Sequence, residues 1–269
     1  MKVISRLGEL DRPCAFVPTM GALHAGHQSL IQIARELCEN VVVSVFVNPL
    51  QFENRDDLEK YPRTPQRDEE LAKAAGATVL WRPDYSEIYP ENYKKLNAGS
   101  VGQLFEGASR PGHFDGVVTV VNRLFELVKP RYAIFGEKDF QQLFLIRQMA
   151  AEHHPEIEII AAPTVRESSG LALSSRNVRL GSSGRVAADA ISAALRAAEN
   201  EESLDEMKER LSVLEAAPYF TLDYAKVIDE ESFEIATENT VRKRAIVAGW
   251  VDGVRLIDNM AMKPALVRS

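Results

Sequence analysis

The sequence has 269 residues, 45% of them hydrophobic, and a formal net charge of −7. A chain of this length can bury one sizeable core and a smaller second one, so we expect two domains. The acidic charge disfavours a broad nucleic-acid surface, which requires Lys and Arg clustered over a whole face. Any anionic ligand must therefore be held by a local site.

The cysteines and the hydropathy pattern indicate in which cellular compartment the protein is located. Cys14 and Cys38 are the only cysteines and both lie beside apolar residues, so we expect buried structural thiols and no disulfide framework. The first ten residues lack the apolar core of a secretory signal. No segment approaches the roughly 20 apolar residues that span a bilayer. We therefore expect a cytoplasmic protein that does not enter a membrane.

The first half of the chain alternates short apolar runs with stretches of helical period, which is typical of a parallel sheet wrapped by helices. The run 41–47 is nearly continuous and β-branched, as a strand buried on both faces should be. Strands are expected at 14–18, 41–47, 78–81, 132–135 and 157–161. Helices are expected at 27–37, 65–75, 114–128 and 139–151. The predicted fold class is α/β, with a Rossmann-like, doubly wound parallel sheet in residues 1–164.

The pattern changes after residue 164, and residues 165–269 are predicted to form a smaller α+β domain. In chain order we expect helices at 186–199 and 204–214, then strands at 219–228, 244–251 and 254–257. Asp252 and Gly253 separate the last two apolar runs, and Asp-Gly in that position is a strong signal for a β-hairpin.

The densest chemistry lies in residues 16–27, where a predicted strand runs through a glycine-bearing turn into a helix. Such a turn points free backbone N–H groups and the positive end of the helix dipole at one place, so we expect an anion there. His24 and His27 are three residues apart and converge on the same volume if they enter the first helical turn. Gly26, without a Cβ, lets a phosphate or a flat ring approach the backbone.

Two other interpretations of these histidines stay open. A lone histidine is more often structural, although here two histidines and two glycines fall where a doubly wound sheet places its ligands. A zinc pair would usually bring a third Cys, Asp or Glu ligand nearby, and none is obvious. The stretch resembles the His-x-Gly-His signature of the nucleotidyltransferase superfamily. That resemblance implies that the histidines stabilise the transition state of attack on an α-phosphate.

Two further segments suit a nucleotide triphosphate. In 135–139, Phe-Gly-Glu-Lys-Asp, Lys138 follows an apolar run and can reach phosphate oxygens, while Gly136 and Asp139 lie near the sugar. In 171–177, Leu-Ala-Leu-Ser-Ser-Arg-Asn, two hydroxyls and a guanidinium suit the β and γ phosphates of ATP. This second segment is similar to the Lys-Met-Ser-Lys-Ser loop of the same superfamily.

Neutral amides mark a separate, acid-binding end of the site. Asn48 and Gln51 come just past a buried strand, where they could hold the hydroxyls and carboxylate of a small acid without a salt bridge. Gln142 lies four residues past Lys138, one helical turn on, so its amide can face the same pocket.

The order of motifs along the chain indicates which family of the superfamily the sequence resembles. They are Pro-Thr-Met-Gly-x-Leu-His-x-Gly-His, Asn-Pro-x-Gln-Phe, Tyr-Pro-Arg-Thr, Arg-Pro-Gly-His-Phe-Asp-Gly-Val, Gly-Glu-Lys-Asp and Ser-Ser-Arg-Asn, between residues 17 and 177, and then Arg-Leu-Ile-Asp-Asn at 255–259. Together they resemble the pantothenate synthetases. The chain departs from the family pattern at Ser169, where many members have Asp.

The resemblance implies an AMP-forming ligase of coenzyme A biosynthesis. Pantoate attacks ATP to give pantoyl adenylate and pyrophosphate, and β-alanine then displaces AMP. The implied catalytic residues are His27, His24 and Lys138. The implied ATP-binding residues are Met20, Gly21, His24, Gly26, His27, Gly136, Glu137, Lys138, Asp139, Val165, Leu173, Ser174, Ser175 and Arg176. For the acid substrate the resemblance implies Gln51 and Gln142. Asn48 joins them in the predicted site for pantoate and β-alanine because of its position just past the buried strand.

The resemblance also implies magnesium with ATP and a homodimer. Because an adenylate hydrolyses when water reaches it, we hypothesise in addition that the C-terminal domain closes as a lid when ATP draws Arg176 inward. The metal ligands stay open, and the conceivable carboxylates are Asp56, Asp57, Asp68 and Asp139, although water and phosphate oxygens can dominate the metal's shell. An alternative in the same superfamily is a nucleotidyltransferase with a phosphorylated acceptor. A tRNA-binding module is a further alternative, which the acidic composition disfavours.

Overall fold

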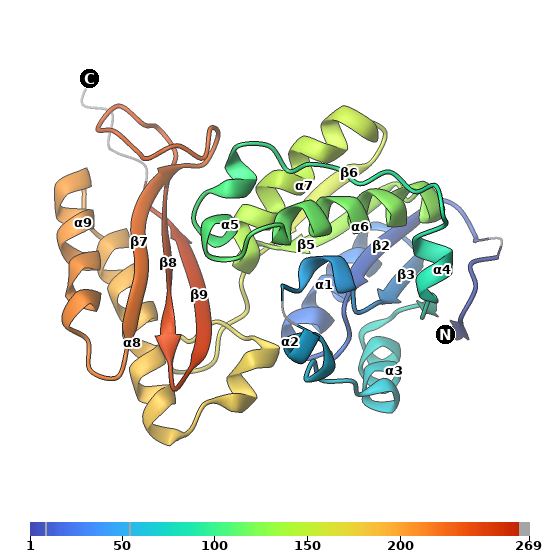
Figure 1. Ribbon diagram of the computed structural model, residues 1–269, viewed down its shortest axis with the longest axis horizontal. Helices are drawn as coiled ribbons and strands as arrows, with labels where there is room; N and C mark the ends of the chain where they lie inside the picture. The colour runs from blue at the N-terminus through green and yellow to red at the C-terminus, as the bar shows by residue number, and fades with distance from the viewer. Residues whose placement is uncertain (9, 54, 264–269) are drawn as a thin grey trace. The chain divides into compact units, whose positions relative to one another are not determined.

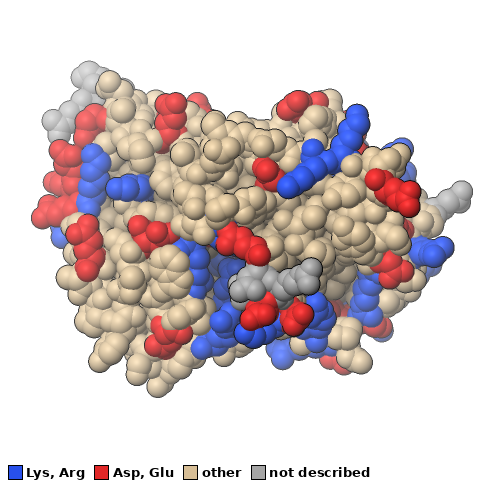
Figure 2. All heavy atoms as spheres, viewed as in Figure 1, with Lys and Arg blue, Asp and Glu red and all other residues tan. Residues whose placement is uncertain are grey.

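The structure is a computed structural model that describes residues 1–8, 10–53 and 55–263 (Figure 1). The chain divides into two compact units, Met1–Thr164 and Val165–Ser269. Acidic and basic side chains are interspersed on the visible face (Figure 2). In the part of the chain that is described, every helix is too short or too polar to cross a lipid bilayer.

The N-terminal unit is built on a six-stranded sheet whose strands all run parallel. The strands are β1 (Lys2–Ile4), β2 (Cys14–Thr19), β3 (Asn40–Val45), β4 (Val79–Trp81), β5 (Tyr132–Gly136) and β6 (Glu158–Ala162). Their order in the sheet is β1-β4-β3-β2-β5-β6. From β2 the chain first builds towards one edge and then returns to add β5 on the other side. The carboxyl ends of β2 and β5 therefore adjoin the topological switch point, where such sheets bind their ligands.

Helices cover both faces of this sheet. The longer ones are α1 (Ala25–Leu37), α3 (Pro65–Ala75), α6 (His113–Val128) and α7 (Phe140–His153), and the short ones are α2 (Arg55–Glu59), α4 (Tyr85–Ile88) and α5 (Glu106–Ser109). Ala15 and Val17 of β2 share a buried cluster with Ile31 of α1. Phe16, which points to the opposite face, packs edge-on against Phe125 of α6 with ring centroids 6.5 Å apart. On that second face α6 and α7 run side by side (Figure 1).

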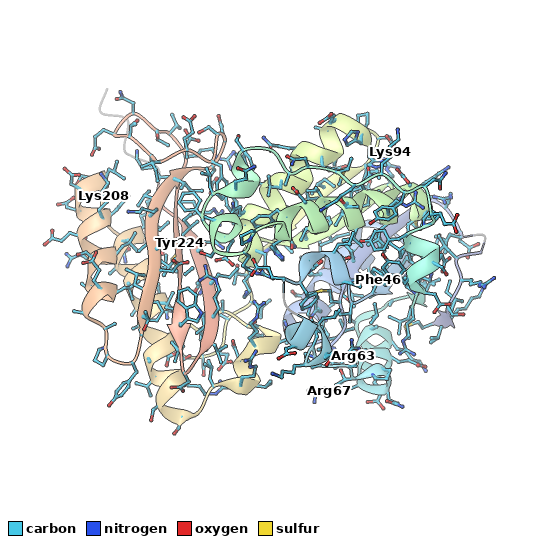
Figure 3. All side chains as sticks on the ribbon, in the orientation of Figure 1. Phe46, Arg63, Arg67, Lys94, Lys208 and Tyr224 are labelled. Atoms are coloured by element: carbon cyan, nitrogen blue, oxygen red, sulfur yellow. The ribbon has the colours of Figure 1, made fainter. Side chains whose placement is uncertain are left out.

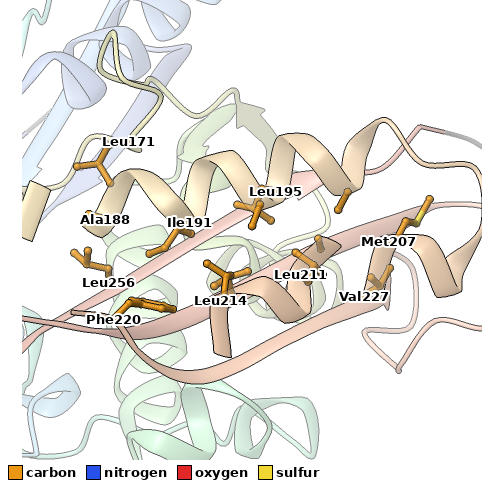
Figure 4. Packing of buried hydrophobic residues seen from close by; sticks show 14 of the residues in the cluster. Leu171, Ala188, Ile191, Leu195, Met207, Leu211, Leu214, Phe220, Val227 and Leu256 are labelled. Atoms are coloured by element: carbon orange, nitrogen blue, oxygen red, sulfur yellow. The ribbon is translucent and has the colours of Figure 1, made fainter. Parts of the chain in front are cut away.

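The C-terminal unit packs helices against a separate antiparallel sheet. Its helices are α8 (Ser182–Glu199) and α9 (Leu204–Ser212), and its strands, in sheet order, are β7 (Thr221–Asp229), β8 (Lys243–Val251) and β9 (Val254–Ala261). Figure 4 shows Ala188, Ile191 and Leu195 of α8 turned towards the sheet, and all three are buried. Asp252 and Gly253 have φ of +51° and +72° and join β8 to β9. Two consecutive positive φ angles are typical of the tight type I′ hairpin turn.

The fold class predicted from the sequence is confirmed, and so are the five strands expected in the first half and the Asp-Gly hairpin. Helix α3 has the predicted bounds, whereas α8 begins at Ser182, four residues before the prediction. The sequence analysis missed β1, a three-residue edge strand with two exposed residues. A strand this short and exposed has no apolar run by which to recognise it. The short helices α2, α4 and α5 were missed because four or five residues are too few to show a helical period.

We predict that Leu195→Ala destabilises the C-terminal unit by about 2–5 kcal/mol, because it removes a fully buried side chain from the centre of the cluster in Figure 4. Val186→Ala is the matched control, since Val186 lies on the same helix with 73% of its surface exposed. Urea unfolding followed by circular dichroism measures both variants. Equal stability of the two variants would contradict this account of the core.

Candidate active site

The turn from β2 into α1 ends in a cap made by two histidines. Nδ1 of His24 accepts a hydrogen bond from the backbone N–H of Gly26 at 3.1 Å, and Nδ1 of His27 accepts from the N–H of His24 at 3.4 Å. The pair thus forms a capping box, a role usually filled by Ser or Thr with Glu or Gln. A backbone N–H can only donate, so both Nδ1 atoms are unprotonated and the neutral rings carry their proton on Nε2. Each ring offers an Nε2–H donor to a ligand.

These two rings are held neutral by their surroundings. Their centroids lie 4.2 Å apart. Burial, helped by the neighbouring His24, lowers the pKa of His27 to about 3. Burial also lowers the pKa of His24, with Lys138 as the second cause. At neutral pH the pair therefore supplies hydrogen-bond donors but no positive charge.

The buried carboxylate of Asp68, on the first turn of α3, holds this turn in place. Its Oδ1 accepts from the N–H of Leu23 at 2.8 Å and from the hydroxyl of Thr64 at 2.9 Å, and its Oδ2 accepts from the N–H of Ala22 at 3.2 Å. Gly21 lies against it with φ of +85°, and a Cβ there would stand 2.9 Å from Asp68 Oδ2. Only glycine fits this position without a shift of its neighbours.

Lys138 approaches the same place from the neighbouring strand. It lies in the 3₁₀ turn Glu137–Asp139 that follows β5, with its Nζ 3.9 Å from Asp139 Oδ1. Lys138 and Asp139 both act on the pKa values of His24 and His27, in opposite directions. The structure thus brings the Gly-Glu-Lys-Asp segment and the histidine turn together at the switch point.

The amides expected at the acid-binding end follow β3, where Asn48 caps the 3₁₀ turn Pro49–Gln51 and Gln51 ends it. Nε2 of Gln51 lies 3.1 Å from the sulfur of Met20, in the turn after β2, so this amide lies beside the histidine segment. Asn48 is only 1% exposed, and its amide bonds to Gln51, Gly116 and Tyr89. Asn48 is thus buried, with both atoms of its amide bonded to protein groups.

Gln141 and Gln142 differ sharply although they are neighbours on α7. Gln141 is buried, and its amide holds the backbone of Val101, Leu104 and Glu106. Gln142 is half-buried, and its side chain makes no hydrogen bond to any residue that the structure describes. Of the two, Gln142 is the amide available to a ligand.

The segment predicted to bind the β and γ phosphates of ATP, residues 171–177, belongs to the C-terminal unit. Leu173 N–H donates to the carbonyl of Val165 at 2.9 Å, which closes a small hairpin. Ser174 caps the following 3₁₀ turn, Ser175–Arg179, by accepting from the N–H of Arg176 at 3.2 Å. The side chains of Ser175 and Arg176 are half-buried and make no hydrogen bonds within the described part of the chain.

This hairpin is fastened to β9 by an ion pair that the sequence analysis did not foresee. Both guanidinium Nη atoms of Arg166 donate to the carboxylate of Asp258, at 2.6 and 2.9 Å, and Asp258 is 4% exposed. A bidentate pair fixes direction as well as distance. Ser169, where many family members have Asp, stabilises the hairpin turn by accepting from the N–H of Leu171 at 3.4 Å.

The carboxylates considered for a metal do not gather in one place. Among the residues that the structure describes, no group of three or more His, Cys, Asp or Glu side chains could hold a metal ion. Asp68 is occupied by backbone amides, and Asp56 is exposed on α2 with Lys60 4.0 Å away. Asp139 lies beside Lys138. The side chain of Asp57 lies outside the described residues.

Asp68 and His113 also support the site, although the sequence analysis gave neither of them a supporting role. His113 accepts from Arg110 at Nε2, 3.1 Å away, and its Nδ1 donates to the carbonyl of Gln51 at 2.9 Å. The sequence did show Asp68 as an acidic residue in the first turn of a predicted helix, just after the Tyr-Pro-Arg-Thr motif. No neighbouring residue in the sequence, however, indicates that its carboxylate faces another loop. His113 stood in a recognised motif whose role only the fold explains.

We predict that protonation of His27 destabilises the fold. Its pKa is lower in the folded chain than the value of 6.5 of an unperturbed histidine, so the unfolded chain binds the proton more tightly. The stabilisation is complete above pH 6.5 and is lost as the pH falls towards 3. Between pH 7 and 5 the wild type should lose about 2 kcal/mol more stability than His27→Gln. Urea unfolding at both pH values tests this, and parallel losses in the two proteins would refute it.

Known proteins resemble the chain over nearly its whole length. The sequence matches the family model described as pantoate-beta-alanine ligase over residues 2–261. A pantothenate synthetase from Acidothermus cellulolyticus is 47% identical over 265 residues, which cover 95% of this chain and 88% of that protein. A pantothenate synthetase from Rhizorhabdus wittichii is 42% identical over 268 residues, which cover 97% and 95%.

Solved structures agree with these matches. The crystal structure of pantothenate synthetase from Thermus thermophilus has a TM-score of 0.91 at 42% identity, over 97% of this chain and 99% of that one. That of pantoate-beta-alanine ligase from Francisella tularensis, complexed with beta-gamma ATP and beta-alanine, has a TM-score of 0.78 at 37% identity, over 92% and 89%. By sequence and by fold alike, the chain belongs to the pantoate–β-alanine ligase family.

Proposed function

We propose that this ligase forms pantothenate in two steps at the switch point between β2 and β5. The carboxylate of pantoate attacks the α-phosphorus of ATP, a new P–O bond forms, and pyrophosphate leaves. The amine of β-alanine then attacks the acyl carbon of the adenylate, loses a proton and displaces AMP. The observation that carries this proposal is the pair of neutral histidines whose Nδ1 atoms are occupied by backbone amides.

Neutral donors suit the first step because no proton has to move in it. The attacking carboxylate is already ionised, and negative charge spreads over the phosphate oxygens in the transition state. Nε2–H groups held in place before charge develops stabilise that state without reorganisation. Lys138 supplies the positive charge that the histidines lack, next to them at the end of β5.

The acid substrate would be held by neutral amides, Gln51 near Met20 and Gln142 on α7. Neutral partners leave the carboxylate reactive, because a salt bridge would withdraw charge from the attacking oxygen. The proposed substrates of this site are ATP, pantoate and β-alanine, and the crystal structure of the Francisella tularensis relative is a complex with beta-gamma ATP and beta-alanine.

The C-terminal unit would supply the remaining phosphate contacts. Arg176 and Ser175 carry hydrogen-bonding groups that no described residue uses, which supports a role as ligands of the β and γ phosphates. Closure around the nucleotide would keep water from the adenylate, a mixed anhydride that water hydrolyses.

Magnesium would reach the site with ATP, bound mainly by phosphate oxygens and water, since the described carboxylates are scattered or engaged. When bound it would screen charge on the departing pyrophosphate. The proposal also includes a homodimer in the cytoplasm. Light scattering after gel filtration tests the dimer, and cell fractionation tests the location.

We expect pyrophosphate exchange into ATP with pantoate alone, and steady AMP formation only when β-alanine is also present. These two activities, measured with magnesium on the purified chain, separate the adenylate step from the amide step. Exchange without pantoate, or with a phosphorylated acceptor in its place, would instead indicate a nucleotidyltransferase.

Gln142→Ala should raise the KM for pantoate several-fold, while kcat and the KM for ATP change little, because it removes a binding contact rather than a transition-state donor. Gln148→Ala is the matched control, since Gln148 is exposed on the same helix. Steady-state kinetics measure the effect, with pantoate and ATP varied in turn while the other substrates are saturating. An unchanged KM for pantoate would remove Gln142 from the acid site.

Arg176→Ala should raise the KM for ATP and abolish any compaction that ATP and magnesium produce in small-angle scattering. Arg179→Ala, an exposed arginine in the same 3₁₀ turn, serves as the control. If wild type and Arg176→Ala compact to the same degree, the lid does not depend on this guanidinium.

A further inference from the structure

A line of buried side chains leads from Tyr89, in none of the recognised motifs, to the amide of Gln51. The hydroxyl of Tyr89 donates to Oδ1 of Asn48 at 2.7 Å, and Nδ2 of Asn48 donates to Oε1 of Gln51 at 3.0 Å. The exposed fractions of these side chains are 4%, 1% and 8%. Water therefore has little access to this line, and each bond has a defined partner.

The direction of every hydrogen bond in this line is set by the backbone. Oδ1 of Asn48 also accepts from the N–H of Leu50 at 3.2 Å, and Nδ2 also donates to the carbonyl of Gly116 at 3.0 Å. A backbone N–H can only donate and a carbonyl can only accept, so the amide of Asn48 has one permitted orientation. Its Nδ2 must face Gln51.

That orientation determines what Gln51 presents to a ligand. Because Oε1 of Gln51 accepts from Asn48, its NH₂ group points the other way, towards the sulfur of Met20 at 3.1 Å. A thioether is a weak acceptor. Gln51 therefore offers donors to the site and needs an acceptor oxygen from whatever binds there.

The surrounding backbone leaves this arrangement little freedom. A Cβ at Gly116 would lie 2.3 Å from the carbonyl oxygen of Leu50 and 2.8 Å from the N of Gln51, so α6 packs by its backbone on the turn. His113, from the first turn of the same helix, donates to the carbonyl of Gln51 at 2.9 Å. The turn that carries Gln51 is thus held from behind at several points.

Tyr89 itself is fixed by an aromatic cluster. Its ring centroid lies 5.0 Å from that of Tyr85, 4.7 Å from that of Tyr93 and 6.1 Å from that of Phe46. Phe46 follows β3 and is labelled in Figure 3. Burial raises the pKa of Tyr89 above its ordinary value, so its hydroxyl keeps the proton that it donates.

We propose that Tyr89 and Asn48 are positioning residues that fix Gln51 as a hydrogen-bond donor to the acid substrate. The inference rests on the proposed function, in which Gln51 contacts pantoate, and it adds the chemical class that the contact selects. A ligand with a carboxylate or hydroxyl oxygen can bind there, because a lone pair on that oxygen accepts a hydrogen bond from the Gln51 NH₂ group. A group that can only donate leaves the Gln51 NH₂ without a partner and is rejected.

The test compares Tyr89→Phe with Tyr85→Phe. Both remove one hydroxyl from the same aromatic cluster, but Tyr85 is 49% exposed and its hydroxyl is not the one bonded to Asn48. Tyr89→Phe should raise the KM for pantoate about three- to tenfold. The KM for ATP and kcat should stay within about twofold, and Tyr85→Phe should resemble wild type.

Asn48→Asp provides a second, sharper variant. An aspartate at this position cannot donate to Gln51, so the Gln51 amide should turn its NH₂ towards the new carboxylate and present oxygen to the substrate. The KM for pantoate should then rise more than in Tyr89→Phe, and calorimetric titration of the folded variant should still detect ATP binding.

The outcomes separate this inference from the function on which it rests. Gln51→Ala, measured in parallel, should raise the KM for pantoate, and an unchanged value would refute the pantoate contact itself. If Gln51→Ala raises it but Tyr89→Phe and Asn48→Asp do not, the positioning role is refuted while the contact stands. Equal increases in the KM for ATP and for pantoate in Tyr89→Phe would also overturn it, since a general loss of structure has that effect.

Discussion

The carboxylate of Asp68 is the interaction on which the site depends. It binds the N–H groups of Ala22 and Leu23 and so determines how the chain leaves β2. The direction of that exit decides where His24 can cap α1, and the cap in turn occupies Nδ1 of both histidines. One buried carboxylate on α3 thereby controls the tautomers of two rings on another element.

On the acid-binding side of the site, around Asn48 and Gln51, backbone groups also set the direction of side-chain hydrogen bonds. Gly116 and Leu50 orient Asn48, which orients Gln51, just as Gly26 and the N–H of His24 orient the histidines. The result is a site of neutral groups with a defined donor direction. Such preorganisation favours a ligand whose charge is spread over oxygens, because the donors need not turn when it binds.

Supporting contacts of this kind come from elements far away in the sequence. Tyr89 is 41 positions from Asn48, and Asp68 is 45 from Leu23. Neither pair has a local pattern that could reveal it. The sequence analysis accordingly placed Asn48 among the substrate ligands and Asp68 among the conceivable metal ligands, on residue type and position alone. The folded chain buries both and engages their polar atoms with protein groups.

The amino acids alone are enough to predict the α/β class, the main strands and longer helices, the Asp-Gly hairpin and the family, because periodicity and ordered motifs are local properties of the chain. They also locate the histidine turn and the Gly-Glu-Lys-Asp turn. That these turns meet follows from the strand order around β2 and β5 in the folded chain. Which of Gln141 and Gln142 is available to a ligand likewise depends on how α7 packs. The reason is physical: pKa shifts, amide orientation and burial depend on neighbours that approach through space, and the sequence does not state which residues those are.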